Sequence, residues 1–137
     1  MTNIIVKKAK LNNSSLKHIV QNNFYFANHN DTLSYDYDFF EIKDKNYILG
    51  YIIKYIVLLD NSNTEYIDIY ILTNFRSKGI GSKALEYYIN NISKKDTIAI
   101  KTSKEDKIRF LLKNNFKHDD VYIYKNLYKY KRNDNNE

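Results

Sequence analysis

The segment whose residue types and spacing point most directly to chemistry is Arg76-Ser-Lys-Gly79-Ile-Gly81, which holds two of the chain's three glycines. Glycine lets the backbone turn sharply and approach a ligand closely. An apolar stretch typical of a strand precedes this segment, and a helical pattern follows it, so the first N–H groups of that helix have no internal partner. The helix dipole and the charges of Arg76 and Lys78 favour an anion there. The segment therefore predicts a turn that binds phosphate.

Two well-known phosphate-binding motifs do not account for this turn. A Walker P-loop needs a glycine five positions before Gly-Lys-Ser/Thr, but Gly81 is followed by Ser82 and Lys83, and Arg76 lies five positions before it. Gly79-Ile-Gly81-Ser-Lys-Ala84 fits a dinucleotide fingerprint. That fingerprint should follow the first strand of a doubly wound sheet, whereas about four predicted strands precede it here. Both motifs are therefore disfavoured.

The elements that must position this turn can be inferred from hydrophobic periodicity. Alternating or continuous apolar runs rich in Ile and Tyr predict strands at residues 3–9, 39–43, 47–59, 65–72 and 97–102, with one or two closing strands between 116 and 129. Helical spacing predicts helices around Leu16 to Phe24, Ile80 to Ile92 and Ile108 to Leu112. The stretch from Ala27 to Asp38 is polar and predicts a loop or a broken helix.

This order of elements, three consecutive antiparallel strands followed by a βαβ unit, predicts an α/β (α+β) fold with helices packed on a mixed sheet. With 137 residues, the chain fits one domain, which we expect at residues 1–130, followed by a disordered tail at 131–137. No apolar run approaches the length of a membrane span, so no membrane partner is expected. The absence of cysteine excludes disulfides, and it agrees with a cytoplasmic location.

The glycine-containing turn resembles the Q/R-x-x-G-x-G/A signature of the GNAT superfamily of N-acetyltransferases. Its neighbourhood strengthens the resemblance, because Ile48-Leu-Gly50-Tyr-Ile is similar to the family's third strand. Phe110 with Lys113-Asn-Asn-Phe116 is similar to the family's F-Y-x-K-x-G-F on the last helix. The resemblance covers residues 3–128. It implies a mixed, mostly antiparallel twisted sheet of six to seven strands, with about four helices on both faces.

The resemblance also implies acetyl-CoA as the acyl donor and an amine as the acceptor. The donor's pyrophosphate should bind the backbone amides of the turn, and its pantetheine arm should run beside the fourth strand, where an amide near Ile71 would polarise the thioester carbonyl. The residues expected to bind the donor are Ile71, Thr73, Arg76, Ser77, Lys78, Gly79, Ile80, Gly81, Ser82 and Ser103.

The catalytic residues follow less directly from the resemblance. Glu65 lies where several family members carry a glutamate, and it is the candidate base, acting through water on the acceptor amine. The alternative is an ordinary carboxylate at a strand edge. The family often has a tyrosine acid at the position of Leu111, so Tyr122 or Tyr124 is the substitute candidate for protonating the leaving thiolate. Asn115 replaces a usual glycine, which is mild because Asn tolerates positive φ.

In this family the acceptor lies near the first helices and the loop that follows them. That region is acidic here and would attract a cationic acceptor such as a polyamine, an aminoglycoside or a peptide amine; its acidic residues are Asp31, Asp36, Asp38, Glu41 and Asp44. A merely solvated acidic loop is the alternative. The oligomeric state stays open, with a homodimer as one outcome.

Two other functions compete with catalysis. Leu111 favours a catalytically silent acyl-CoA-binding sensor of the same fold. The net charge of +6 and the tyrosines among lysines at the C-terminal end favour a nucleic-acid-binding module. The second is disfavoured because no RNP-type pattern is present. No metal site is expected, since the three histidines, His18, His29 and His118, are scattered.

Overall fold

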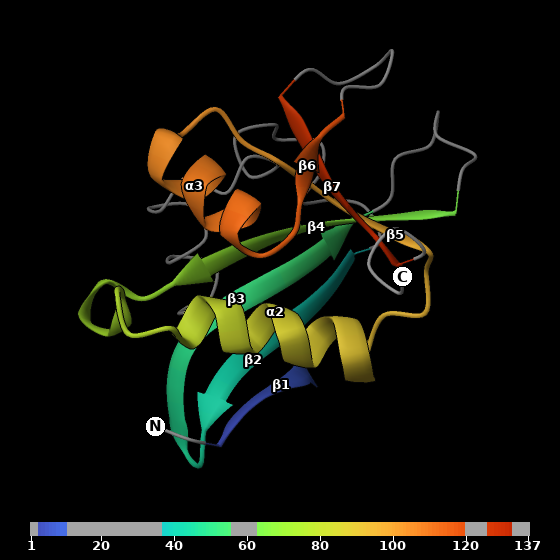
Figure 1. Cartoon of the computed structure of the whole chain (residues 1–137). Coiled ribbons are helices and arrows are strands. Elements are labelled where there is room, and N and C mark those ends of the chain that lie inside the picture. Colours follow the sequence, from blue (N-terminus) through green and yellow to red (C-terminus); the bar gives the residue numbers. More distant parts are fainter. Residues whose placement is uncertain (1–2, 11–36, 56–62, 120–125, 133–137) are drawn as a thin grey trace.

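A seven-stranded sheet forms the centre of the computed structural model, which describes residues 3–10, 37–55, 63–119 and 126–132 (Figure 1). The spatial order is β1-β2-β3-β4-β5-β7-β6, and only the β4–β5 pair is parallel. The strands are β1 (Ile4–Ala9), β2 (Tyr37–Asp44), β3 (Tyr47–Tyr55), β4 (Thr64–Ile71), β5 (Thr97–Lys101), β6 (Lys117–His118) and β7 (Leu127–Lys131). The predicted mixed, mostly antiparallel sheet is confirmed.

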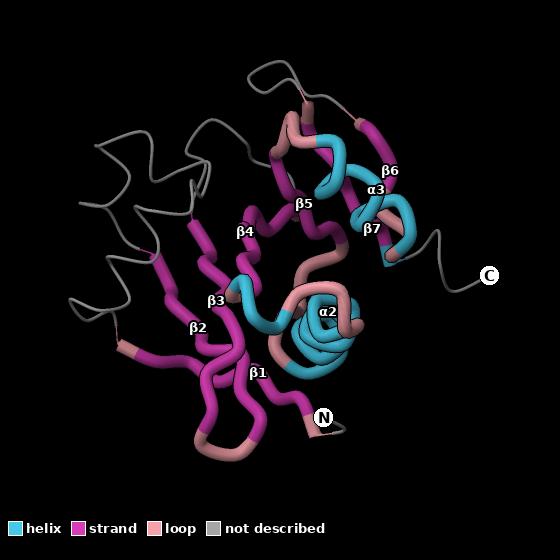
Figure 2. The backbone as a smooth tube through the Cα atoms, turned by 90° about the vertical axis from the view of Figure 1, so that its left-hand side faces the viewer, coloured by secondary structure: helices cyan, strands magenta, loops and turns pink. Residues whose placement is uncertain are grey.

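Two α-helices, α2 (Ile80–Asn91) and α3 (Glu105–Lys113), occur in the described part of the chain, with a short 3-10 turn, η3 (Thr73–Phe75), before α2. Both helices pack on the same face of the sheet (Figure 2). The described part thus holds two of the about four helices expected for the whole chain, and the predicted helix around Leu16 to Phe24 lies outside the described residues. Neither described helix has the length and apolar character needed to cross a membrane.

The main core lies between this face of the sheet and the two helices. Every third or fourth residue of α2 is apolar, and its buried side chains are Ile80, Ala84, Leu85, Tyr88 and Ile89. The helix predicted around Ile108 to Leu112 is confirmed as α3, on which Leu111 is fully buried and Leu112 is half exposed. Burying a large apolar side chain contributes about 1.5 to 3 kcal/mol to folding stability. The buried side chains of α2 and α3 therefore hold both helices on the sheet.

Two predicted boundaries shift because strand pairing extends further than the local pattern suggested. Asp38 belongs to β2 and faces Lys54 on β3, so it does not lie in a loop. Lys131 is paired with Thr97 as the last residue of β7, and it is not part of a disordered tail. Arg132 follows it and donates one hydrogen bond to the carbonyl of Ser93 and another to the carbonyl of Lys95.

Gly50 marks an irregularity that brings β3 unusually close to β4. The β2–β3 register shifts between Ile42 and Lys43, opposite the Gly50 region. A Cβ at Gly50 would lie 2.2 Å from the Tyr70 carbonyl oxygen, a distance that no real Cβ adopts. Glycine is therefore required here, and it lets the C-terminal half of β4 lie close against β3.

Candidate active site

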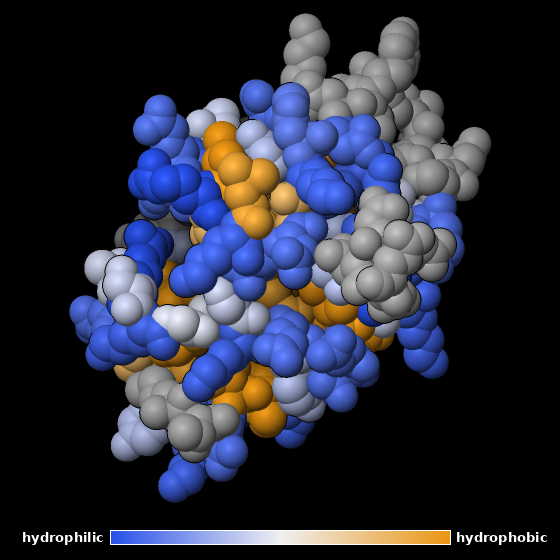
Figure 3. Space-filling model, viewed as in Figure 1, coloured by the Kyte–Doolittle hydropathy of each residue, from blue (hydrophilic) through white to orange (hydrophobic). Residues whose placement is uncertain are grey.

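A cavity of about 500 Å³ opens where β4 and β5 stop pairing. The two strands pair only from Thr64 to Tyr66 on β4, whereas β3 follows β4 as far as Ile71. The walls come from the second half of β4, the turn before α2, the segment after β5, and α3. Patches of apolar surface are visible between the hydrophilic residues over α2 and those over α3 (Figure 3). Half of β4 therefore exposes a strand edge to a cavity.

The backbone groups on that edge can be assigned from the pairing of β4. The Leu72 N–H donates to the Leu49 carbonyl on the β3 side. Because backbone groups alternate between the two edges of a strand, Ile69 and Ile71 direct their N–H and C=O groups to the opposite, open edge. A chain-like ligand could add to this edge as an extra strand.

The glycine-containing turn closes one end of the cavity. Gly79 is the residue before α2 and has φ 76°, a left-handed conformation that favours glycine, although a Cβ there would meet nothing within 4 Å. No side chain caps the start of α2, and its first turn holds no acidic residue. The first amides of α2 thus have no side-chain acceptor in competition with a bound anion.

Gly81 has a different requirement from Gly79. Its Cβ would lie 2.9 Å from the ring of Phe110 on α3 and 3.6 Å from a side-chain carbon of Ile71. The absence of a side chain therefore lets α3, α2 and the end of β4 converge at the cavity. This contact also explains why Phe110, which the sequence indicated only through the family pattern, belongs to the cavity wall.

Arg76 lies against the open edge of β4. Its Nε donates a 2.9 Å hydrogen bond to the Ile71 carbonyl, and its guanidinium carbon lies 4.8 Å from the centre of the Tyr70 ring. The side chain is exposed and retains hydrogen-bond donors for an anion. Arg76 is thus held beside the turn by β4.

Most of the residues predicted to bind the donor are brought together in this cavity. Those that line it are Ile71, Arg76, Ser77, Gly79, Ile80, Gly81, Ser82 and Ser103. Thr73, in η3, and Lys78 are both exposed, and neither lines the cavity. Sequence reasoning missed the contribution of α3, because its residues are distant in sequence from the signature.

A partly buried charge pair lies in the cavity wall between β4 and α3. The Lys107 ammonium contacts the Asp68 carboxylate and donates a 3.1 Å hydrogen bond to the Ile69 carbonyl. Asp68 also accepts a 2.9 Å hydrogen bond from the Ile69 N–H. Sequence reasoning did not single out either residue. The available signal was a lone aspartate inside the apolar run of β4, which has to find a partner when buried.

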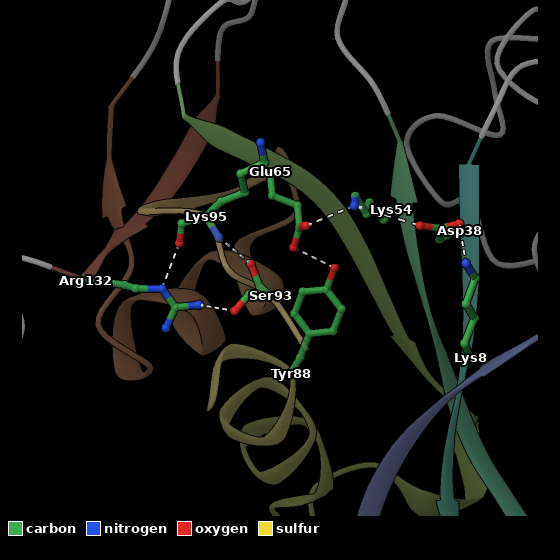
Figure 4. Close-up of polar contacts among 8 residues, drawn as sticks. All are labelled: Lys8, Asp38, Lys54, Glu65, Tyr88, Ser93, Lys95 and Arg132. Atoms are coloured by element: carbon green, nitrogen blue, oxygen red, sulfur yellow. Dashed lines mark hydrogen bonds and ion pairs between the residues drawn. The ribbon is translucent and has the colours of Figure 1, made fainter. Parts of the chain in front are cut away.

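Glu65 lies in a different environment, under α2 (Figure 4). It is 5% exposed, accepts a 2.6 Å hydrogen bond from the Tyr88 hydroxyl, and lies 3.3 Å from the Lys54 ammonium. Burial, and secondarily the hydrogen bond to Glu65, raise the pKa of Tyr88 well above its usual range. Glu65 does not line the cavity, and it precedes Ile71 by six residues, about 20 Å of strand.

The charges around Glu65 form a row across four neighbouring strands. Lys54 also lies 3.8 Å from Asp38, which lies 3.1 Å from Lys8 (Figure 4). Asp38 is therefore balanced by two lysines, which weakens its predicted attraction for a cationic acceptor. The predicted acceptor-site residues Asp31 and Asp36 lie outside the described residues, as do the predicted acids, Tyr122 and Tyr124. Glu41 and Asp44 belong to β2.

Leu111, at the family's tyrosine position, is fully buried in the core under α3. It therefore serves packing. Among the described residues, no cluster of three or more histidines or carboxylates could hold a metal ion.

Comparison with known proteins agrees with this geometry. A sequence model described as Acetyltransferase (GNAT) family matches residues 10–116. A search of curated proteins found no match. The chain belongs to the GNAT acetyltransferase family, whose acyl donor is acetyl-CoA.

Solved structures with the same fold are distant in sequence. A GNAT family acetyltransferase from Elizabethkingia anophelis with acetyl-CoA bound has a TM-score of 0.70 and 18% identity, over 96% of this chain and 99% of that one. The spermidine/spermine N-acetyltransferase SpeG from Vibrio cholerae, in mutant forms, has a TM-score of 0.65 and 12% identity, over 96% of each chain. The ribosomal protein α-N-acetyltransferase RimL has a TM-score of 0.61 and 14% identity, over 96% and 94%.

Proposed function

We propose that this protein transfers the acetyl group, or a related acyl group, from acetyl-CoA to a primary amine of a small molecule or peptide by direct attack in a ternary complex. The observation that carries the proposal is a single cavity that joins an anion-binding turn to the open edge of β4. The turn suits a pyrophosphate, and the strand edge suits an amide-containing arm. Coenzyme A carries both groups in this order.

In this proposal the donor's pyrophosphate binds the amides between Ser77 and Ser82, close to Arg76. The pantetheine amides then pair with the outward N–H and C=O groups at the end of β4. The Ile71 carbonyl already accepts a hydrogen bond from Arg76. An amide N–H of the pantetheine arm therefore either shares this carbonyl with Arg76 or replaces Arg76 as its donor. An amide of the same edge polarises the thioester carbonyl and stabilises the oxyanion that forms.

The acceptor has to attack as a neutral amine. For a lysine-like amine with a pKa near 10.4, deprotonation at pH 7 costs about 4 to 5 kcal/mol, so a base in the site accelerates the reaction. Asp68 is a carboxylate in the cavity wall and is one candidate. Glu65 remains the other, through a chain of water, although its bonds to Tyr88 and Lys54 favour a structural role. Tyr122, Tyr124 or water would protonate the thiolate.

A paired measurement tests this proposal. Thermal unfolding with and without coenzyme A reports binding, and thiol release from acetyl-CoA with a panel of amines reports transfer. Arg76→Glu combined with Gly79→Asp should abolish stabilisation by coenzyme A, because both changes put negative charge beside the diphosphate. Lys94→Glu is the matched control, since Lys94 is exposed and does not line the cavity. Equal loss in both variants would contradict a local anion site.

A catalytically silent acyl-CoA-binding sensor is the second candidate, favoured by the packed Leu111 at the position of the family's tyrosine acid. Stabilisation by coenzyme A without thiol release on any amine would select this alternative. An acceptor of polyamine or peptide type would be identified by the same panel.

A further inference from the structure

The cavity wall contains a primary amine that belongs to the protein itself. The side chain of Lys107 is 21% exposed, and that of its partner Asp68 is 3% exposed. Lys107 reaches from α3 to the open edge of β4, where its ammonium donates to the Ile69 carbonyl. Because Ile69 and Ile71 present their backbone groups to the same edge, the amine lies where the donor's arm would run.

The carboxylate of Asp68 completes an acceptor arrangement around this amine. Asp68 contacts the ammonium directly, and the Ile69 N–H holds the carboxylate in place at 2.9 Å. A carboxylate in direct contact with the amine can act as a general base, because it can take the proton that the amine has to lose before it attacks. Three other lysines line the cavity: Lys104 and Lys113 are exposed, and Lys101 is half-buried at the end of β5.

We propose that Lys107 is an acyl acceptor within the chain, so that the protein acylates its own cavity from an acyl-CoA thioester. The inference rests on the proposed donor site. Asp68 takes a proton from the Lys107 ammonium, and the neutral Nζ attacks the thioester carbonyl carbon. A C–N bond forms and the C–S bond breaks. As the C–S bond breaks, the nitrogen gives up its second proton to the departing coenzyme A thiolate, so that free thiol is released and Lys107 carries an amide, while Asp68 returns its proton to solvent.

Acylation changes the charge of the cavity. The amide nitrogen of acyl-lysine has no positive charge, so Asp68 loses a cationic partner while remaining buried. The Ile69 carbonyl also loses its ammonium donor. The acylated protein therefore presents a more negative cavity, which should bind a polyanionic donor less tightly. The reaction is expected to stop at one acyl group in the cavity.

The experiment incubates the full chain with acetyl-CoA and follows acetylation of each lysine by peptide mass spectrometry. Lys107 should be modified at least about tenfold faster than Lys104 and Lys113, which share the cavity but lack a buried carboxylate contact of this kind. Lys107→Arg should remove the rapid phase of total acetylation, because arginine is not acetylated, while it keeps a cation beside Asp68. Asp68→Asn should slow it by about 100-fold near neutral pH, and by less at alkaline pH, where hydroxide can deprotonate the amine.

The controls separate this inference from the proposed function. Arg76→Glu with Gly79→Asp should reduce acetylation of Lys107 to the rate of Lys104. Stabilisation by coenzyme A without preferential acetylation of Lys107 would overturn the inference and leave the donor site intact. Absence of stabilisation, with every lysine modified at one slow rate, would overturn both. Circular dichroism of each variant establishes that the fold is retained.

Discussion

Removal of one hydroxyl group, in Tyr88→Phe, gives a direct measure of what holds Glu65 in place. The Tyr88 hydroxyl donates a 2.6 Å hydrogen bond to one carboxylate oxygen of Glu65, and Lys54 lies 3.3 Å from the other. Both Tyr88 and Glu65 are buried. A hydrogen bond to a charged group contributes about 1.5 to 3 kcal/mol. Since phenylalanine keeps the ring, almost no cavity forms, and the loss of unfolding free energy should fall in this range.

Urea unfolding at pH 7 measures this loss, with an unchanged m-value as evidence that the unfolding transition is the same. Tyr87→Phe is the matched control, because Tyr87 precedes Tyr88 on α2 and its hydroxyl makes no hydrogen bond to a described residue. The control should lie within about 0.5 kcal/mol of the parent protein. A Tyr88→Phe loss below about 0.5 kcal/mol would refute the view that this hydrogen bond anchors Glu65.

The pH dependence gives a second check with a definite sign. Because the pKa of Tyr88 is raised in the folded protein, the unfolded chain releases this proton first as the pH rises. The stability due to the neutral hydroxyl is fully present below about pH 10 and falls above it. The difference in unfolding free energy between the parent protein and Tyr88→Phe should therefore become smaller at alkaline pH. A gap that widens there would contradict the assignment.

Two further changes test other parts of the structure. Gly50→Ala places a Cβ 2.2 Å from the Tyr70 carbonyl oxygen before relaxation, and it should lower the free energy of unfolding in urea by at least about 1 to 3 kcal/mol. An unchanged unfolding midpoint would show that β3 and β4 are not closely apposed there. The hydrogen bond from Lys131 lowers the pKa of Asp119. Asp119→Asn should therefore lower the free energy of unfolding by under about 1 kcal/mol at pH 7, and this loss should vanish as the pH falls through the lowered pKa. A loss that stays constant in acid would exclude a stabilising ion pair.

The glycine-containing turn could be predicted from the sequence because all of its determinants are local. Arg76, Gly79 and Gly81 lie within six residues, and strand and helix periodicities flank them. The conformation of Gly79 and the start of α2 follow from these residues without reference to the rest of the chain. The identity of the sheet neighbours was also accessible, since short turns and a βαβ connection restrict the topology.

The contacts that define the rest of the site depend on residues far apart in the sequence. Lys107 reaches Asp68 across 39 residues, and Tyr88 reaches Glu65 across 23. Both carboxylates are on β4, and the sequence singled out only Glu65 as a candidate base. Only the folded chain gives them different surroundings, because the side chain of Glu65 lies under α2 while Asp68 lies where β5 has stopped pairing.

The sequence by itself thus determined the fold, the glycine-containing turn before α2 and the family, because periodicity and turn chemistry act over a few residues. The tertiary structure decided which charged side chains meet and which of them line the cavity. The physical reason is that burial and the packing of α3 against β4 are set by the whole sheet, and no local pattern encodes the partner of a buried charge.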